Sequence, residues 1–372
     1  MNVNPLTAYL DDLTVPVYLA GSSALDIYFG NGSSERLLVA VEGTLIDLAK
    51  SFSELEYPGI EGFDARLTTD DGQIYFTCVD SGQRPPAQYV AAMNLYYDYR
   101  NRKFLDFRSV YYDIRSGELR PLEGEPLPAV AADWQLIVDA AILIARYNLN
   151  PEDLELPAPP QAIELSPGGQ RLLLELVLTG RYTKQGLAFL LRTGFVARHW
   201  PEFTKMDGIN HSKAHHPEGN VWEHTLETFS YRKTQDLILS LGLLFHDSGK
   251  PYAQRRENRM FDGHAEIGME IGRGFMKRLA FPDEVISDAS FLIRQHMLPP
   301  YIAKLATYRT ETVMSNPLFP LLLELYRCDV SATYRGPDGY YEACKVYRRF
   351  LKNSKNPFRG ADGKKLLKLY VE

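Results

Sequence analysis

The sequence predicts an α+β fold in which a mixed α/β head precedes an all-α part. Short β-prone runs separated by turns fill the chain to about residue 125. Beyond that point apolar residues recur with the spacing of helices. Pro121, Pro126 and Pro128 lie where one pattern gives way to the other.

The head opens with the pattern of a strand, a helix and a second strand. Val15–Leu19 and Leu37–Val41 are β-prone, and Ser22–Phe29 between them has the character of a helix. Three later segments continue the strand pattern: Ile74–Val79, Leu95–Tyr99 and Val110–Ile114.

The remaining chain reads as helices joined by short loops. Apolar faces are predicted in three consecutive helices: Trp134–Tyr147, Gln170–Leu178 and Gln185–Arg192. A proline-rich connector, Pro151–Pro167, separates the first from the others, and nearly everything after Val221 is helical. We therefore predict a head over 1–125, a helical neck over 126–200, a helical domain over 201–350 and a basic segment over 351–372.

Composition places the chain among globular proteins. It has 372 residues, of which 45% are hydrophobic and 24% charged, with a net charge of -6. That charge disfavours an indiscriminate coating of nucleic acid. Cys78, Cys328 and Cys344 have neither paired nor metal-ligand spacing, which indicates reduced thiols. With no secretion signal and no long apolar run, we expect a soluble cytoplasmic protein.

Histidine and aspartate residues recur within the predicted helices of the 201–350 domain. Taken singly, a histidine in a helix is more often a surface or hydrogen-bonded core residue. The ordered set H…HD…H…H…D instead favours one site, because a helical bundle can bring such side chains together in its interior. Its members are His224, His246, Asp247, His264, His296 and Asp329.

Imidazole and carboxylate ligands together suit a divalent metal ion, but they do not distinguish Mn, Fe, Ni, Co, Mg or Zn. We expect His224, His246, Asp247 and Asp329 to hold a first ion. His264 and His296 leave a second ion open, with Asp247 able to bridge. Lys250 is a candidate phosphate contact, or simply a solvated cation. His199, His211 and His215 fall in a loop-like stretch and are not expected to be ligands.

The second half of the chain resembles a known family. Residues 200–224 resemble the HD region of bacterial tRNA nucleotidyltransferases and poly(A) polymerases. Leu244–Pro251, Gly263–Gly268 and His296–Pro299 are similar to the later HD motifs. The resemblance implies a metal-dependent phosphodiesterase or phosphatase that acts on nucleotides and on 2′,3′-cyclic phosphate ends.

The head resembles the same family more faintly. Val17–Asp26 looks like the nucleotidyltransferase opening, a strand followed by Gly-Gly-x-x-Arg-Asp. Gly21 and Asp26 match this pattern, whereas Ser22 and Leu25 depart from it. In the neck, Asp139 and Ile142 occupy the places of family arginines.

The family's catalytic carboxylates are replaced in this alignment. Its two metal-binding aspartates fall at Arg36 and Leu38, and its third carboxylate falls at Tyr75. Mg²⁺ needs oxygen ligands of the carboxylate kind, which these side chains do not supply. The resemblance therefore implies a nucleotidyltransferase-like head that has lost its catalytic carboxylates.

These observations favour an HD-family metal-dependent phosphohydrolase with His246, Asp247 and Lys250 as catalytic residues, and they do not favour nucleotidyl transfer. Two alternatives remain: a non-enzymatic nucleotide- or RNA-binding or sensor protein, and a divergent tRNA nucleotidyltransferase or poly(A) polymerase. The expected partners are a small phosphoester or nucleotide and an RNA 3′ end, without a membrane. Basic residues in the tail could also meet RNA or be a solvated face: Arg348, Arg349, Lys352, Lys355, Arg359, Lys364 and Lys365.

Overall fold

A computed structural model of the chain contains two compact units, which meet in sequence between His199 and Trp200. It describes residues 4–31, 35–124, 132–152, 154, 156, 165–209, 219–256, 259–334 and 336–352. Most of the proline-rich connector, the loop histidines His211 and His215, and the basic tail after Lys352 lie outside this described part.

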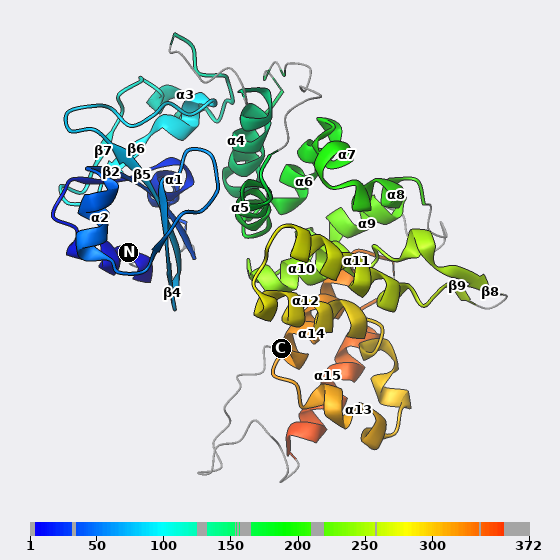
Figure 1. Cartoon of the computed structure of the whole chain (residues 1–372). Helices are drawn as coiled ribbons and strands as arrows, with labels where there is room; N and C mark the ends of the chain where they lie inside the picture. The colour runs from blue at the N-terminus through cyan, green and yellow to red at the C-terminus, as the bar shows by residue number, and fades with distance from the viewer. Residues whose placement is uncertain are drawn as a thin grey trace. The chain divides into compact units, whose positions relative to one another are not determined.

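A seven-stranded mixed sheet forms the centre of the first unit (Figure 1). Its strand order is β3-β4-β5-β2-β1-β6-β7, and only β2 and β5 run parallel. The parallel register sets Leu38 opposite Tyr75. The strands are β1 Val17–Leu19, β2 Arg36–Glu42, β3 Leu55–Glu56, β4 Ala65–Thr69, β5 Gly72–Val79, β6 Tyr96–Asp98 and β7 Lys103–Leu105.

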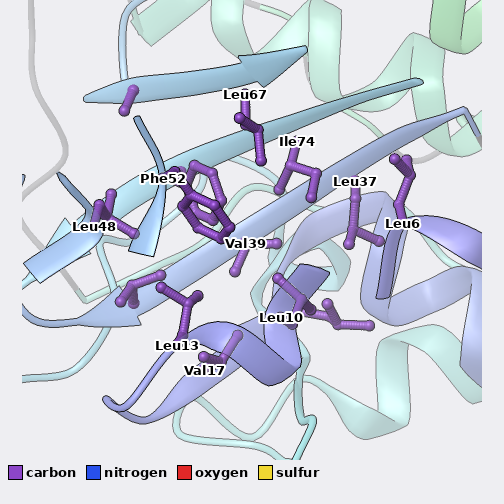
Figure 2. Close-up of a cluster of buried hydrophobic side chains, with 14 of the residues drawn as sticks. Leu6, Leu10, Leu13, Val17, Leu37, Val39, Leu48, Phe52, Leu67 and Ile74 are labelled. Atoms are coloured by element: carbon purple, nitrogen blue, oxygen red, sulfur yellow. The ribbon is translucent and has the colours of Figure 1, made fainter. Parts of the chain in front are cut away.

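A 3-10 helix, η1 (Pro5–Asp12), packs its apolar side against the sheet (Figure 2). The side chain of Asn4 caps this helix by accepting a hydrogen bond from the backbone N–H of Leu6. Leu6 and Leu10 are fully buried there, beside Val39 and Ile74 of the sheet. Burial of these side chains supplies the hydrophobic stabilisation of the head.

Helices flank the sheet and continue into the neck. Helix α4 packs against both α5 and α6, and the fully buried side chains of Ile137 and Leu143 come from α4. The helices of this unit are α1 Gly21–Phe29, α2 Leu45–Ser51, α3 Tyr111–Ser116, α4 Ala132–Tyr147, α5 Pro167–Leu178, α6 Thr183–Arg192 and α7 Phe195–His199.

The second unit is helical around an aromatic core. Phe203 contacts Trp222, Phe245 and Phe275 at ring-centroid distances of 5.0 to 5.7 Å. The longer elements are α9 Val221–Thr228, α10 Leu237–Phe245, α11 His264–Arg278, α12 Asp283–Gln295, α13 Thr307–Met314, α14 Phe319–Ser331 and α15 Asp338–Lys352. A short α8 (Thr204–Asp207) precedes them, and a hairpin of β8 (Gln254–Arg256) and β9 (Arg259–Asp262) interrupts them.

The predicted fold class is confirmed: a mixed α/β head is followed by a mainly helical region. One predicted strand is wrong, because Val110–Ile114 lies largely in helix α3. Its β-branched and aromatic residues favour a strand, but Asp106 accepts hydrogen bonds from the backbone N–H groups of Val110 and Tyr111 and so starts a helix. The β8–β9 hairpin is a further departure from the predicted all-α region.

Among the described residues, none of the helices combines the length and the apolar character that crossing a bilayer requires.

Buried ion pairs connect the sheet region to the neck helices within the first unit. Arg146 of α4 donates to Asp26 of α1 at 2.6 Å, and the hydroxyl of Tyr147 donates to the same carboxylate at 2.8 Å. Arg36 of β2 donates to Glu175 of α5 at 2.8 Å, where both side chains are buried. Each pair compensates charges that would otherwise be costly to remove from water.

The Asp26→Ala substitution is expected to destabilise the first unit strongly. It leaves the buried Arg146 guanidinium without its carboxylate, which typically costs about 3–5 kcal/mol of unfolding free energy. The Lys50→Ala substitution breaks an exposed ion pair with Asp47 and should cost far less. Urea denaturation of both variants measures this difference, and equal losses would contradict the role given to the buried pair.

Asp139 predicts a pH dependence of stability. Burial raises the pKa of this carboxyl to about 7, although hydrogen bonds from Gln135 and from backbone N–H groups lower it in part. The unfolded chain releases the proton near pH 4 and the folded chain only near pH 7, so stability is lost as pH rises between these values. Asp139→Asn lacks this titration. The wild type should lose about 3–4 kcal/mol of unfolding free energy relative to this variant as the pH rises from 4 to 7. If the difference in unfolding free energy between the two proteins does not change with pH, the assignment is refuted.

Candidate metal centre

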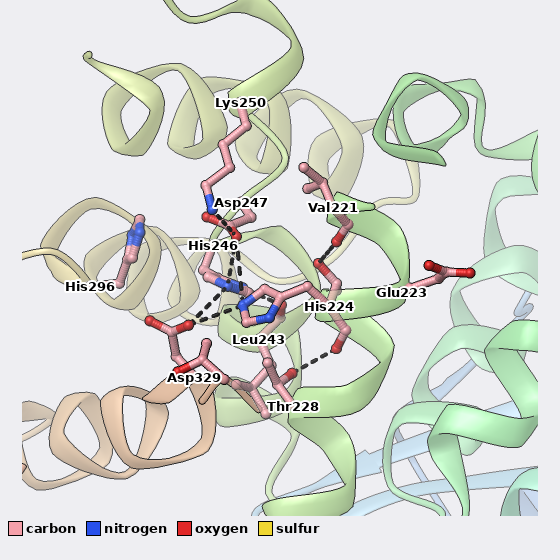
Figure 3. Close-up of polar contacts among 12 residues, drawn as sticks. Val221, Glu223, His224, Thr228, Leu243, His246, Asp247, Lys250, His296 and Asp329 are labelled. Atoms are coloured by element: carbon pink, nitrogen blue, oxygen red, sulfur yellow. Dashed lines mark hydrogen bonds and ion pairs between the residues drawn. The ribbon is translucent and has the colours of Figure 1, made fainter. Parts of the chain in front are cut away.

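The structure brings all six predicted ligands together inside the second unit. Figure 3 shows five of them: His224, His246, Asp247, His296 and Asp329. Each histidine is buried, as is Asp247, whereas the side chain of Asp329 is 26% exposed. Five segments contribute: α9 carries His224, the end of α10 carries His246 and Asp247, α11 begins at His264, α12 ends before His296 and α14 carries Asp329.

Two groups of three ligands can be distinguished. In the first, His224, His246 and Asp329 offer one ligand atom each, all within 4.8 Å of one another. The Nε2 of His224 lies 3.0 Å from Oδ1 of Asp329, and the Nε2 of His246 lies 4.0 Å from the same oxygen.

The second group is formed by Asp247, His264 and His296. The Nε2 atoms of the two histidines are 3.1 Å apart, and Oδ1 of Asp247 lies 3.7 Å from Nε2 of His264. The other oxygen of Asp247, Oδ2, lies 3.2 Å from Nε2 of His246 in the first group. One carboxylate therefore faces both groups.

Backbone carbonyls fix the orientation of three imidazoles. The Nδ1 atoms of His246, His264 and His296 lie 2.7 to 2.8 Å from the carbonyl oxygens of Leu243, Phe261 and Ile293. A carbonyl only accepts hydrogen bonds, so each Nδ1 must carry the proton. In the neutral ring the Nε2 lone pair then points into the site, the arrangement that metal-binding histidines adopt.

As a result, hydrogen-bond acceptors face one another at close range. The Nε2 lone pairs of His264 and His296 oppose each other at 3.1 Å. The Nε2 of His246 is buried and makes no hydrogen bond, although Oδ2 of Asp247 is only 3.2 Å away. Contacts between acceptors repel unless a proton or a cation lies between them. The donor set therefore fits a metal ion.

Burial and neighbouring groups favour the metal-binding protonation states of His264, His296 and Asp247. Burial, together with repulsion from the imidazoles of His246 and His264 when these are protonated, lowers the pKa of His296 to about 3. Burial also lowers the pKa of His264. Although burial alone would raise the pKa of Asp247, the His246 imidazole in its protonated form and the Lys250 ammonium hold this pKa well below its usual range. Neutral imidazoles and ionised carboxylates are the metal-binding forms.

Lys250 lies at the edge of the centre. Its Nζ forms an ion pair with Oδ2 of Asp247 at 2.6 Å, and its side chain is only 11% exposed. The ammonium is thus already engaged by the bridging carboxylate. Its predicted contact with a phosphate stays a prediction.

The backbone sets the spacing between the turn after α10 and helix α11. A Cβ at Gly249 would collide with the carbonyl oxygen of His264 and lie 2.6 Å from the backbone nitrogen of Gly268. A Cβ at Gly268 would lie 3.1 Å from the carbonyl oxygen of Phe245. Glycine at these positions allows the segments that carry Asp247 and His264 to approach closely.

In the head, the positions that align with the family's catalytic carboxylates do not form a second group of metal ligands. Leu38 and Tyr75 are buried neighbours in the sheet, and Arg36 is bound to Glu175. Asp26 is taken by Arg146 and Tyr147. Within the described part of the head, no three metal-ligand side chains come together.

Sequence reasoning missed the groups that position the ligands. The carbonyls of Leu243, Phe261 and Ile293 each lie three residues before the histidine that they orient. That constant offset is visible in the sequence once the histidines are known. The pairing of Arg36 with Glu175 joins residues 139 positions apart and left no sequence signal.

Comparisons with known proteins point to one family. No family model matches the chain. A CC-adding tRNA nucleotidyltransferase of Thermus thermophilus is 32% identical over 212 residues, which cover 54% of this chain and 47% of that protein. A multifunctional CCA protein of Nitrosococcus oceani is 26% identical over 315 residues, covering 76% and 74%. The chain thus spans about half the length of the Thermus relative.

A solved structure supports the same fold. The crystal structure of the Bacillus stearothermophilus CCA-adding enzyme in complex with CTP superimposes with a TM-score of 0.51 at 17% identity. The match covers 94% of this chain and 83% of that enzyme. At this level of identity the likeness establishes the fold alone.

These findings correct the enzyme class expected from the sequence. An HD-family phosphohydrolase without nucleotidyl transfer was expected, but these relatives and this structural neighbour are named for nucleotidyl transfer and CCA addition. The ligand motifs pointed to the metal centre alone and carried no information on the activity of the protein as a whole. The chain is similar in sequence to a CC-adding tRNA nucleotidyltransferase over about half of its length.

Proposed function

We propose that this protein binds a nucleotide and the 3′ end of an RNA, as a divergent protein of the tRNA nucleotidyltransferase type. The observation that carries the proposal is the alignment of 212 residues with the CC-adding tRNA nucleotidyltransferase of Thermus thermophilus. The fold shared with a CCA-adding enzyme that was crystallised with CTP supports it.

Binding and transfer are separable parts of this proposal. Transfer of a nucleotidyl group depends on positioning and on neutralising phosphate charge with carboxylate-held metal ions. Arg36 and Tyr75 stand in the head where the resemblance places two of the family's carboxylates, and Glu175 engages Arg36. Recognition of nucleotide and RNA does not need those carboxylates, so recognition is the function that we propose.

We further propose that the two ligand groups of the second unit hold divalent metal ions. His224, His246 and Asp329 would bind one ion, His264 and His296 would bind the other, and Asp247 would contact both. The opposed acceptor atoms of His264 and His296 support this assignment, since a cation between them removes their repulsion. A divalent ion held there supplies Lewis acidity and charge for phosphate oxygens.

Metal content tests the second proposal. We expect the protein, purified without chelators, to carry about two ions per chain, one for each ligand group. The His224→Ala and His264→Ala variants should each retain about half of that content, because each removes one ligand from one group. Asp247→Ala should lose most of it, since this carboxylate faces both groups. Inductively coupled plasma mass spectrometry measures the ratio.

The control is Glu270→Ala, because Glu270 lies on α11 with His264 but its side chain is 64% exposed. It should keep the wild-type metal content, and circular dichroism checks that every variant is folded. Wild-type protein with no more metal than folded Asp247→Ala would contradict the proposed centre.

Binding to matched RNAs tests the first proposal. We expect a linear tRNA that lacks its terminal nucleotides to bind at least about tenfold more tightly than a circularised RNA of the same sequence, a difference of 1.4 kcal/mol. The physical reason is that only the linear form offers a free 3′ end. Fluorescence anisotropy measures both affinities, and isothermal titration with CTP and ATP measures nucleotide binding.

Equal affinity for the linear and circular RNAs would refute recognition of a 3′ end. Incorporation of labelled CMP or AMP into the linear RNA, measured in the same reactions, would show that transfer itself is retained.

A further inference from the structure

The head exposes aromatic rings from three segments that the proposed function has not used. Phe29 ends α1, Phe104 lies in β7, and Tyr111 and Tyr112 begin α3; these elements are labelled in the head in Figure 1. The ring of Tyr28 contacts Phe29, Phe104 and Tyr111 at centroid distances of 5.0, 5.8 and 5.7 Å. We call these five residues the aromatic patch.

The patch is held in place but remains accessible to solvent. Phe29 and Phe104 are each 38% exposed, Tyr111 is 47% exposed and Tyr112 is 72% exposed. Edge-to-face contacts at Tyr28 fix the neighbouring rings, with interplanar angles of 79 to 90°. Several large rings gathered at one surface indicate an interaction site, because exposed apolar area of this kind is otherwise unfavourable.

Cations border the aromatic patch. Arg102 and Lys103 directly precede Phe104, and Arg115 lies four residues after Tyr111, on the same side of α3. In the described part of the chain, none of these three cations belongs to an ion pair.

The acidic residues of this region are occupied by internal partners. Asp98 accepts hydrogen bonds from Asn101 at 2.9 and 2.8 Å. Asp106 caps α3 through backbone N–H groups, and Asp113 binds Arg120 through both oxygens, at 2.6 and 2.9 Å. Only Asp113 is neutralised, by Arg120, whereas Asp98 and Asp106 keep their negative charges. The three cations Arg102, Lys103 and Arg115 outnumber these two carboxylates, so the charge beside the aromatic patch is positive, although the whole chain has a net charge of -6.

We infer that the aromatic patch binds single-stranded RNA. Bases would stack on the exposed rings, chiefly Tyr111 and Tyr112, while Arg102, Lys103 and Arg115 meet the phosphates. Aromatic rings combined with basic side chains suit single strands, because every base has a face that stacks and every nucleotide carries a phosphate. The inference rests on the proposed RNA-binding function and adds a second contact, away from the RNA 3′ end.

A peptide is the competing occupant, because β7 lies at the edge of the sheet and could pair with an added strand. The unpaired cations favour the polyanion over a neutral peptide.

The test uses a circular single-stranded RNA of about 20 nucleotides, which has no 3′ end, and the full-length protein. Tyr111→Ala and Tyr112→Ala together should weaken its binding at least about thirtyfold, because two base-stacking contacts are lost. The matched control is Tyr57→Ala, which removes a tyrosine that is 79% exposed elsewhere on the head. It should leave the affinity unchanged.

Salt dependence separates stacking from charge. The triple variant R102Q/K103Q/R115Q should reduce the slope of log affinity against log salt by about 2, because three phosphate contacts to a single strand are lost. The tyrosine variants should leave this slope unchanged. Circular dichroism checks that all variants fold.

The inference is overturned if the folded tyrosine variants bind the circular RNA as tightly as the wild type does. This holds also if the same variants no longer bind a peptide or protein partner, because the patch would then be a protein-binding site. If the proposed function fails, the wild-type protein binds linear and circular RNA equally well. That result does not depend on how the tyrosine variants bind the circular RNA, so the two failures can be distinguished.

Discussion

Charge buried in the interior must be compensated where it lies, and this requirement governs both units. In the first unit, Arg146 and Arg36 find their carboxylates on other elements, so the ion pairs join the sheet region to the neck helices. In the second unit, two carboxylates and the single ammonium of Lys250 leave one negative charge among neutral imidazoles. The first arrangement is complete in itself, whereas the second has the charge that the proposed metal ions would balance.

The two units thus differ in whether their buried polar groups are already bound to other parts of the protein. At the nucleotidyltransferase-like positions of the head, Arg36 and Asp26 are bound to protein partners and Tyr75 is buried. At the metal centre, Nε2 of His246 has no hydrogen-bond partner. One protein of similar sequence is named as a CC-adding tRNA nucleotidyltransferase. In this chain, the binding sites that we propose lie in the second unit and on the surface of the head.

Much of the fold could be predicted because its elements are encoded locally. Helix α9 begins at the capping box of Asn220 and Glu223, and β2 and β5 are continuous β-prone runs. Helix α3 could not be predicted, because the cap supplied by Asp106 outweighs the strand-like composition of the segment.

The six candidate ligands, and their division into a first and a second group, were predicted from their order in the sequence. The structure differs in one member, because Asp247 lies with His264 and His296 as well as beside His246. Its position depends on which way the two oxygens of Asp247 turn, and tertiary packing sets that direction. The activity of the protein as a whole was likewise outside the reach of the ligand motifs. Those motifs describe one centre within the second unit, whereas the alignments with the relatives extend over more of the chain.

The backbone contact at Gly249 and Gly268 has a consequence for how this protein can evolve. Main chain rather than side chains separates the turn that carries Asp247 from the helix that carries His264. Substitutions in the surrounding apolar core, at Phe245 or Phe275 for example, can therefore alter packing without moving these two ligands apart. A single added methyl group at Gly249, by contrast, would push these two segments apart, whereas one at Gly268 would need only a small shift of its neighbours.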